Sequence, residues 1–374
     1  MRVLFDHQIF FYQKVGGISK YFFKLINELL KIDNIEILLY QGLYRNIYGF
    51  AQNNEGFLFY RGYRRPEWLK LWKLWKLIDF FQKGRLKKII KSYQVDVYHP
   101  TYYYFNYPAS KPRIVLTVHD MIHELFPQYF PSAKEEIGEK EKAIKMADAL
   151  IAVSQNTKKD LMEIYKVNPE KVFVVYHGVD APPNLPTERK LILSAKLPKP
   201  YILYVGSRKL YKNFDCLIKS FKNPAMQGFG LVCAGGGPFT REEELKLSKS
   251  GIAEERILQI SGDDSTLYEL YRNAFCFVFP SLYEGFGLPI LEAMFAGCPV
   301  VASNRSCFPE VGGDVALYFD PSNPEELAYF ILRLDSESYR NSKIAAGLQR
   351  AGEFTWAKTA RETLEVYKFA KESC

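Results

Sequence analysis

The sequence predicts an α/β protein with two doubly wound, Rossmann-like domains. Short apolar runs typical of strands alternate with amphipathic helical segments, as parallel βαβ units require. A stretch at 180–200, with five prolines and no long apolar run, interrupts this alternation and suits a linker. The length of 374 residues also favours two domains, because single cores stop growing at about 250–300 residues.

The first half contains six predicted strands, at 2–6, 36–40, 95–100, 113–120, 149–154 and 171–178. Apolar residues at helical spacing predict helices between them, at 19–32, 132–148 and 154–165. Ser132 and Ser154 open the last two of these helices and can cap them. We therefore expect the first domain to span residues 1–185.

The same pattern restarts after the linker. The predicted strands of the second half are at 201–207, 230–237, 257–262, 275–281 and 299–303. The predicted helices are at 213–223, 265–274, 289–297 and 324–335. We expect a second domain at 186–355 and a final helix at 356–374 that crosses back to the first. Two such domains would face each other across a cleft lined by the carboxyl ends of their strands.

The composition is that of a soluble globular chain, with 48% apolar and 25% charged residues. No run of 18 apolar residues occurs, and Asp6 comes too early for the apolar core of a signal peptide. The six cysteines are scattered without metal-binding spacing, which favours buried free thiols. These observations predict a cytoplasmic protein.

Positive charge is concentrated at 61–91, where eleven basic and two acidic residues give a net charge of +9. On a helical projection, three tryptophans (Trp68, Trp72, Trp75) and Leu71, Leu74 and Ile78 fall on one arc. Lys70, Lys73 and Lys76 fall opposite. This pattern suits an interfacial helix on an anionic membrane surface. An ordinary helix that faces the core and solvates its lysines is the alternative.

Two predicted strand ends carry residues suited to phosphate. Gly16 and Gly17 precede a helix, where close backbone approach and unpaired N–H groups favour an anion, although a simple loop is also possible. Arg208 and Lys212 follow a strand and can clamp a diphosphate, unless they form an exposed basic turn. The glycines at 234–239 lack the spacing of a dinucleotide fingerprint and predict a tight turn.

The segment "SLYEGFGLPILEAM" (281–294) places Glu284 on a glycine-rich loop and Glu292 beyond Pro289, which suits the first helical position. Glu292 is then expected in the first turn. Carboxylates only accept hydrogen bonds when ionised, so they suit sugar hydroxyls. The segment therefore predicts a site for a polyhydroxylated ligand that carries phosphate, against the alternative of a strand-to-helix turn with solvated acids.

The stretch "EGFGLPILE" resembles the paired-glutamate signature of retaining glycosyltransferases of family four, which have the GT-B fold. The resemblance covers nearly the whole chain, through "TVHDMIHELFPQYF", "VYHGVD", "VGSRKLYKN" and "FTWAKTARETLEVY". The "VHD" stretch followed by "PQYF" is most similar to the branch that contains bacterial O-antigen mannosyltransferases.

The resemblance implies that the domain at 1–185 binds the acceptor and that the domain at 186–355 binds the nucleotide-sugar donor. It also implies a role for each matching residue. Four are implied to be catalytic: His119, which lines the donor sugar, Glu284, which accepts from its hydroxyls, and Arg208 and Lys212, which neutralise the diphosphate. The implied donor contacts also include Gly16, Gly17, Gly262, Gly285, Phe286, Gly287, Leu288 and Glu292. Glu292 would bind the ribose, Gly262 belongs to the 260–263 loop beside the base, and Asp120 and His177 would be neighbours of the site.

The implied function is transfer of a hexose, with mannose from GDP-mannose as the best candidate, onto a lipid-linked or growing glycan such as O-antigen or capsule. The donor is a substrate, no metal or other cofactor is expected, and no nucleic acid is expected as a partner. Negative charge grows on the departing diphosphate, so cations stabilise the transition state. A peripheral position on the inner face of the cytoplasmic membrane follows from the basic segment.

Three alternatives remain open. The same chemistry could use a UDP-sugar, or the chain could be a sugar-nucleotide epimerase of the same fold. A non-enzymatic membrane-surface binding module would explain the basic segment but would leave Glu284 and Glu292 without a role.

Overall fold

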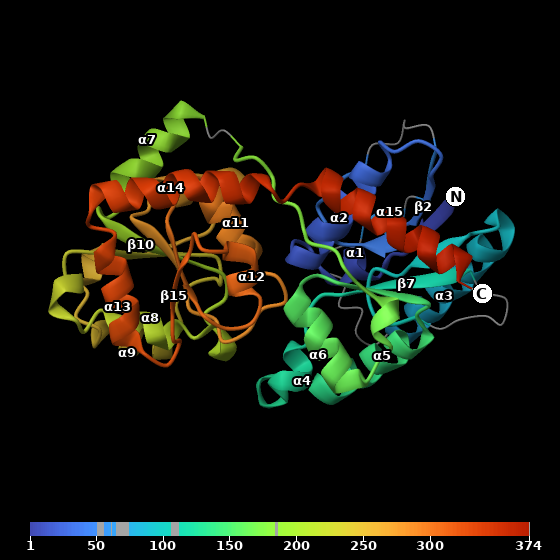
Figure 1. The fold of residues 1–374 in the computed structure, drawn as a ribbon, viewed down its shortest axis with the longest axis horizontal. Coiled ribbons are helices and arrows are strands. Elements are labelled where there is room, and N and C mark those ends of the chain that lie inside the picture. Colours follow the sequence, from blue (N-terminus) through green and yellow to red (C-terminus); the bar gives the residue numbers. More distant parts are fainter. Residues whose placement is uncertain (51–55, 61, 65–74, 106–111, 184–185, 374) are drawn as a thin grey trace. The chain divides into compact units, whose positions relative to one another are not determined.

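The computed structural model describes residues 1–50, 56–60, 62–64, 75–105, 112–183 and 186–373, which form two compact units (Figure 1). The first unit comprises residues 1–178 and the last helix, from residue 356. The second comprises residues 179–355. The chain leaves the first unit seven residues before the boundary predicted at 185, and it returns at the predicted position.

The first unit is built on a parallel sheet, and its described strands have the order β4-β2-β1-β6-β7-β8-β9. The strands are β1 (Arg2–Phe5), β2 (Glu36–Tyr40), β4 (Phe57–Tyr60), β6 (Val97–His99), β7 (Arg113–Val118), β8 (Ala149–Ala152) and β9 (Val172–Val174). The direction of the order reverses between β1 and β6. Two further short strands, β3 (Leu43–Tyr44) and β5 (Tyr63–Arg64), pair with each other.

The second unit repeats this plan with the order β12-β11-β10-β13-β14-β15, again entirely parallel. The strands are β10 (Tyr201–Val205), β11 (Gly230–Ala234), β12 (Ile257–Ile260), β13 (Cys276–Phe279), β14 (Val300–Ser303) and β15 (Leu317–Phe319). Here the order reverses between β10 and β13. The units are therefore two Rossmann-like halves, as predicted.

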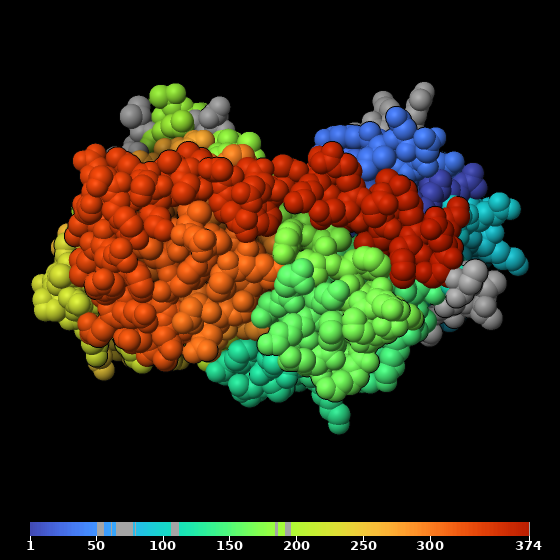
Figure 2. All heavy atoms as spheres, in the orientation of Figure 1, coloured from blue at the N-terminus to red at the C-terminus, as the bar shows by residue number. Residues whose placement is uncertain are grey.

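Helices connect the strands of each sheet. Those of the first unit are α1 (Gln8–Tyr12), α2 (Gly17–Leu29), α3 (Trp75–Tyr93), α4 (Ile122–Leu125), α5 (Ala133–Met146), α6 (Gln155–Tyr165) and α15 (Trp356–Glu372). Those of the second are α7 (Thr187–Lys196), α8 (Phe214–Ser220), α9 (Arg241–Ser248), α10 (Asp264–Asn273), α11 (Leu288–Phe295), α12 (Phe308–Gly312), α13 (Pro324–Arg333) and α14 (Glu337–Gly352). Figure 2 shows α14 on the surface of the second unit, where only Gly347 and Ala351 of this helix are buried.

Two local predictions are wrong. The predicted linker contains helix α7, because the prolines of 180–200 lie on both sides of residues 187–196 and leave these residues free to form a helix. Ser132 precedes α5 but makes no side-chain capping bond. Ser154 does cap α6, since its hydroxyl accepts a hydrogen bond from Thr157 N at 3.0 Å.

The last helix belongs to the core of the first unit. Trp356, Ala360 and Tyr367 are buried together with apolar residues of β1, β2 and α2. Tyr367 Oη lies 2.7 Å from Nδ1 of the buried His99, whose Nε2 lies 2.8 Å from Thr117 Oγ1. This polar chain connects α15 to β6 and β7, and it fixes the C-terminal helix on the first sheet.

The cysteine prediction is confirmed for Cys216, Cys233, Cys276, Cys298 and Cys307, which are free and buried. Cys374 lies outside the described residues. In the described part of the chain, no helix combines the length and the hydropathy that a membrane span requires.

Candidate functional site

The reversal of strand order in the second unit brings Lys212 and Glu284 together. Ligands of doubly wound sheets bind outside the carboxyl ends of the strands at such a reversal. Lys212 lies on the segment after β10, and Glu284 lies on the loop after β13. Lys212 Nζ is 2.5 Å from Glu284 Oε1, and the two side chains are only 17% and 13% exposed. A cation and a carboxylate are thus paired where the fold favours a ligand.

Contacts between the two loops hold this pair. Asn213, which follows Lys212, has a left-handed conformation with a φ of 53°. Its Nδ2 donates a hydrogen bond to Pro280 O at 3.1 Å. Leu282 N donates to Tyr211 O at 2.7 Å, so the two loops are also connected through their backbones. Residues on either side of the ion pair therefore set its position.

Arg208 is directed into a glycine turn. Its Nε donates to Glu243 Oε1 at 2.9 Å, and its Nη atoms donate to the carbonyl oxygens of Gly235, Gly237 and Pro238 at 3.1, 2.9 and 3.0 Å. The three consecutive glycines from Gly235 have φ values of 78°, 71° and 75°, which favour glycine. The predicted tight turn is thus present. To bind a diphosphate directly, the guanidinium would have to exchange some of these partners.

The loop before α11 has the predicted glycine-dependent shape. Gly287 caps α11 with a φ of 88°, and a Cβ atom there would lie 3.3 Å from the ring of Phe308. Gly285 and Phe286 are buried beside it, and Leu288 is the first helical residue. The backbone at 286–288 therefore passes through the N-terminal end of α11, where helix N–H groups favour negative charge.

Glu292 is the fifth residue of α11, so it lies in the second turn rather than the predicted first turn. The helix begins at Leu288, and Pro289 is consequently its second residue. Glu292 is 9% exposed. Helix α11 packs against α10, and the charge of Glu292 contributes, after burial itself, to raising the pKa values of Tyr268 and Tyr271 of α10.

A cavity of about 220 Å³ lies at the ends of β10, β11 and β12. Gly206, Gly262 and Asp263 are among the residues that line it. A Cβ atom at Gly262 would be 2.6 Å from Thr266 Cβ, so a larger residue would require a shift there. Hydrogen bonds from Thr266 lower the pKa of Asp263, which caps α10, to about 2. The predicted 260–263 loop thus borders a cavity with an ionised carboxylate at its edge.

In the first unit, Gly16 and Gly17 form the start of α2, as predicted. Gly16 is the N-cap residue, and Gly17 is exposed with open space around its Cβ position. Gln13 occupies part of this helix end, because Ser19 N donates to Gln13 Oε1 at 3.1 Å. Gly17 therefore keeps an accessible backbone.

His119 is buried at the end of β7. Its ring centre lies 5.2 Å from that of Tyr21 and 5.9 Å from that of Phe22. Burial lowers the pKa of His119 to about 3, with smaller contributions from His99 and Lys140, so the imidazole is neutral near pH 7. His119 can therefore take part in a site as a neutral hydrogen-bonding group and not as a cation.

The two predicted neighbours of His119 have structural contacts. The ring of His177 stacks on that of Tyr21, with centres 4.7 Å apart, and burial places its pKa well below the ordinary value. Asp120 Oδ1 accepts a hydrogen bond from Ile122 N at 3.1 Å.

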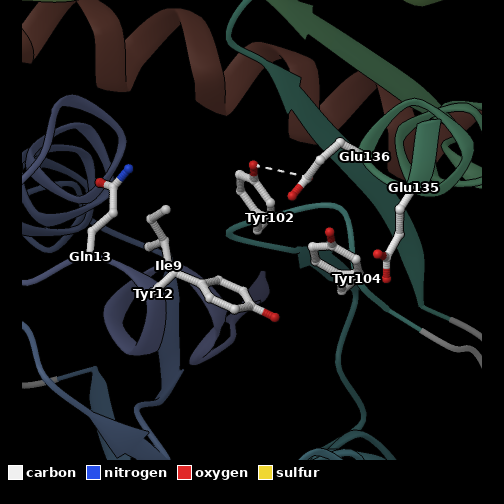
Figure 3. A pocket seen from close by; sticks show the side chains of 7 residues that line it. All are labelled: Ile9, Tyr12, Gln13, Tyr102, Tyr104, Glu135 and Glu136. Carbon is white, nitrogen blue, oxygen red and sulfur yellow. Dashed lines mark hydrogen bonds between the residues drawn. The ribbon is translucent and has the colours of Figure 1, made fainter. Parts of the chain in front are cut away.

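The sequence interpretation missed a pocket of about 300 Å³ in the first unit. Figure 3 shows three tyrosines and two glutamates directed into it, and its lining residues are Ile9, Tyr12, Gln13, Tyr102, Tyr104, Glu135 and Glu136. The run "TYYYFNY" (101–107) was the available signal, but it indicated only a high aromatic content. In the described residues, no three His, Cys, Asp or Glu side chains are grouped as ligands for a metal ion.

Two family models match the chain. The model "Glycosyltransferase Family 4" covers residues 15–181, and "Glycosyl transferases group 1" covers residues 188–348. The chain belongs to glycosyltransferase family four. Its two Rossmann-like halves have the GT-B fold of these enzymes.

Several known proteins are similar to this family-four glycosyltransferase. O-antigen chain mannosyltransferase B of Escherichia coli is 28% identical over 98% of this chain and 100% of its own length. The serotype-specific mannosyltransferase WbdA of Escherichia coli is 30% identical over 71% of this chain, but the match covers 35% of WbdA. The crystal structure of Anabaena Alr3699/HepE in complex with UDP-glucose has a TM-score of 0.71 and 17% identity, and covers 99% of this chain and 100% of that one.

The buried histidines predict that the first unit loses stability in mild acid. Burial lowers the pKa values of His99 and His119 from 6.5 to about 3, and that of His177 well below 6.5. In the unfolded chain these histidines keep their ordinary, higher pKa values and bind protons below about pH 6.5, whereas in the native unit they stay neutral. The stability that the neutral histidines contribute is therefore complete above about pH 6.5. Below this pH the free energy of unfolding decreases, by up to about 1.4 kcal/mol per pH unit for each histidine.

Urea unfolding between about pH 7 and pH 5 measures this slope. His99→Asn should reduce the change of unfolding free energy with pH by the amount that one buried histidine contributes. The matched control is His123→Asn, which changes a half-buried histidine of the same unit. A free energy of unfolding that stays constant over this interval would contradict the assignment of neutral buried histidines.

Proposed function

We propose that this protein is a retaining, metal-independent mannosyltransferase that moves mannose from GDP-mannose onto a growing surface glycan such as O-antigen or capsule, carried on a lipid. The observation that carries the proposal is the Lys212–Glu284 pair at the strand-order reversal of the second sheet. A sugar diphosphate needs a cation near its phosphates and, close to that cation, a hydrogen-bond acceptor for its sugar hydroxyls. This pair supplies both.

The remaining residues fit around such a donor. Lys212 and the N–H groups at 286–288 would meet the diphosphate, and Glu284 would accept from the sugar hydroxyls. Glu292 would bind the ribose hydroxyls, and the cavity beside Gly262 would take the base. The cation and the helix start stabilise the charge that develops on the leaving group, an effect typically worth several kcal/mol.

In this proposal Arg208 mainly positions other groups, whereas the resemblance implied that it contacts the diphosphate. Its hydrogen bonds to Glu243 and to the turn at 235–238 make it a positioning residue for the strand ends. A direct contact with phosphate would come only with a change of partners. Lys212 therefore takes the main role in neutralising the leaving group.

In the proposed reaction, the acceptor hydroxyl oxygen forms a bond to C1 of the donor sugar. The bond between C1 and the phosphate oxygen breaks, and its electron pair remains on the diphosphate. The proton of the acceptor passes to the departing phosphate oxygen on the same face of the sugar, which retains the anomeric configuration. His119 is neutral and would contribute a hydrogen bond to the sugar.

The mannosyltransferase names of the relatives in Escherichia coli favour mannose as the transferred sugar, and GDP-mannose is the donor that we propose for it. One solved neighbour contains UDP-glucose, so a UDP-sugar is the alternative donor. The first experiment is a panel of nucleotide sugars in excess EDTA, with acceptor glycan and proton NMR of the product. We expect turnover of GDP-mannose, no loss of rate with chelator, and an α-linked product.

Loss of activity with EDTA and recovery with Mg²⁺ or Mn²⁺ would contradict metal independence. Preference for a UDP-sugar would overturn the donor assignment alone. Epimerisation of the donor without acceptor would identify the epimerase alternative.

The ion pair predicts that removing either of its two charges lowers kcat. Lys212→Met removes the cation beside the leaving group, and Glu284→Gln removes the anionic acceptor for the sugar hydroxyls. Each should lower kcat by about 10²–10³, the typical effect of removing one transition-state contact. Steady-state kinetics with the preferred donor measure this.

The matched control is Lys246→Met, because Lys246 also pairs with a carboxylate, Asp215, at 2.9 Å, but both side chains are at least 40% exposed. It should keep wild-type kcat. If Lys212→Met folds normally and retains full activity, Lys212 has no role at the leaving group.

The described part of the basic segment supports membrane association. Helix α3 buries Leu86, Ile89 and Ile90, whereas Phe80 and Phe81 are 71% and 65% exposed. Four basic residues are exposed on the same helix: Arg85, Lys87, Lys88 and Lys91. Exposed aromatic rings beside basic residues suit an anionic lipid surface. Residues 65–74, with most of the tryptophan and lysine pattern, lie outside the described residues, as do the side chains of Trp75 and Lys76.

We therefore expect Phe80→Ser/Phe81→Ser to weaken binding to anionic liposomes, because each buried phenyl ring contributes about 1.5–3 kcal/mol. Liposome flotation should show wild-type binding that needs anionic lipid and declines with salt. Leu245→Ser/Tyr329→Ser changes two exposed apolar residues of the second unit and should have no effect. Equal flotation of both double variants would overturn the assignment of α3.

A further inference from the structure

Two neighbouring loops of the second unit meet at Glu284. The serine loop, defined as residues 304–307, connects β14 to α12, and the glutamate loop, residues 280–287, connects β13 to α11. β13 and β14 are parallel neighbours, so both loops leave the same edge of the sheet, and the helices that follow them pack against each other (Figure 1). The serine loop contains none of the residues that the resemblance implied for the site.

Ser306 bonds to the backbone of Glu284 in both directions. Its Oγ donates a hydrogen bond to Glu284 O at 2.5 Å and accepts one from Glu284 N at 3.4 Å. Cys307 Sγ lies 3.3 Å from the same carbonyl oxygen. Burial, followed by the charge of Glu284, raises the pKa of the Cys307 thiol well above its ordinary value, so the thiol keeps its proton and can donate. The serine loop therefore bonds to both polar backbone groups of Glu284.

Ser306 has a backbone conformation that favours glycine. Its φ of 54° lies in the left-handed region, which strains a residue that carries a Cβ atom. A glycine would adopt this conformation with less strain, but it would lack the hydroxyl. What serine adds at this position is consequently the hydrogen bond to Glu284. Backbone strain of this kind concentrates at functional sites.

The serine loop is itself fixed to the sheet. Asn304 N donates a hydrogen bond to Phe319 O of β15 at 2.9 Å. Tyr318 Oη, also on β15, donates to Phe308 O at 3.1 Å. The ring of Phe308, the first residue of α12, lies 3.3 Å from the place that a Cβ atom of Gly287 would take. The glutamate loop is thus supported near both of its functional parts by groups that are bonded to β15.

We infer that Ser306 is a positioning residue for the transfer reaction, whose hydroxyl holds the backbone of Glu284 so that its carboxylate stands beside Lys212 and meets the donor sugar. This inference rests on the proposed function and adds a residue that acts through Glu284 and not through contact with the donor. A carboxylate fixed in advance loses little freedom when the sugar binds. A misplacement of about 1 Å can lower a rate by about 10².

Two variants separate the hydroxyl from the backbone. Ser306→Gly removes the hydroxyl but relieves the left-handed strain, so it should be as stable as the wild type. It should still lower kcat about tenfold or more, with the donor KM within about threefold of the wild type. Ser306→Thr keeps the hydroxyl where a β-branched residue is strained, so it should unfold at a lower urea concentration and keep kcat within about threefold. A purely structural role predicts the opposite ranking of kcat.

The matched control is Lys166→Gly. Lys166 has a φ of 53°, close to that of Ser306, but it is an exposed residue at the end of α6 in the first unit. The variant relieves the same kind of strain and should keep wild-type kcat. Urea unfolding and steady-state kinetics with the preferred donor compare the variants.

A double-mutant cycle tests whether Ser306 acts through Glu284. Glu284→Ala leaves no side chain for the hydroxyl to position. Adding Ser306→Gly to this variant should therefore lower kcat by less than about twofold further, because the two residues act as one unit. If the two losses multiply in full, or if Ser306→Gly keeps wild-type kcat, the inference is wrong.

Hydrogen exchange separates this inference from the proposed function, because it needs no substrate. Without donor, the backbone amides of 281–288 should exchange faster in Ser306→Gly than in the wild type, whereas Lys166→Gly should not change them. Equal exchange in Ser306→Gly and the wild type would overturn the inference. If no nucleotide sugar reacts, the proposed function fails, and the exchange rates still decide whether Ser306 holds the glutamate loop.

Discussion

The reversal of strand order in the second sheet is the constraint on which the proposed donor site depends, and the first sheet has the same reversal. Between β10 and β13, and between β1 and β6, the connections leave toward opposite sides of the sheet, so the loops at these strand ends separate and leave room for a ligand. The reversal also brings residues from distant parts of the chain to one edge. Lys212 meets Glu284 across 72 residues, and Tyr12 meets Tyr102 in the same way.

Burial of charge at these edges is possible because each charged group is bonded. Arg208 is compensated by Glu243 and three carbonyl oxygens, and Asp6, at the end of β1, accepts hydrogen bonds from Thr101 and Tyr98. An unpaired charge in such places would cost several kcal/mol. The same bonds fix the strand ends before a ligand arrives. Groups held in advance lose little freedom on binding, which is the physical basis of preorganised electrostatic stabilisation.

The sequence was sufficient for the elements whose cause is local. Continuous apolar runs predicted the central strands, and the glycine-rich segment predicted the loop before α11, where Gly287 has a φ of 88°. Elements without a strong local pattern were missed, such as β15 and α14, and α7 was hidden between prolines. The pocket of the first unit that is lined by Tyr12, Tyr102 and Tyr104 could not be predicted, because its residues come from three segments. Their proximity depends on strand order, which no single stretch of sequence specifies.

The two units differ in the charge state of the polar groups that they bury. In the first unit, His99, His119 and His177 are neutral through burial. In the second, Lys212 stands beside Glu284 at the helix start. An anionic leaving group is stabilised by a cation close to it, and Lys212 provides one at the strand-order reversal of the second sheet. In the proposed reaction, the charge that stabilises the departing diphosphate therefore comes from the second unit, and the neutral histidines of the first unit add none.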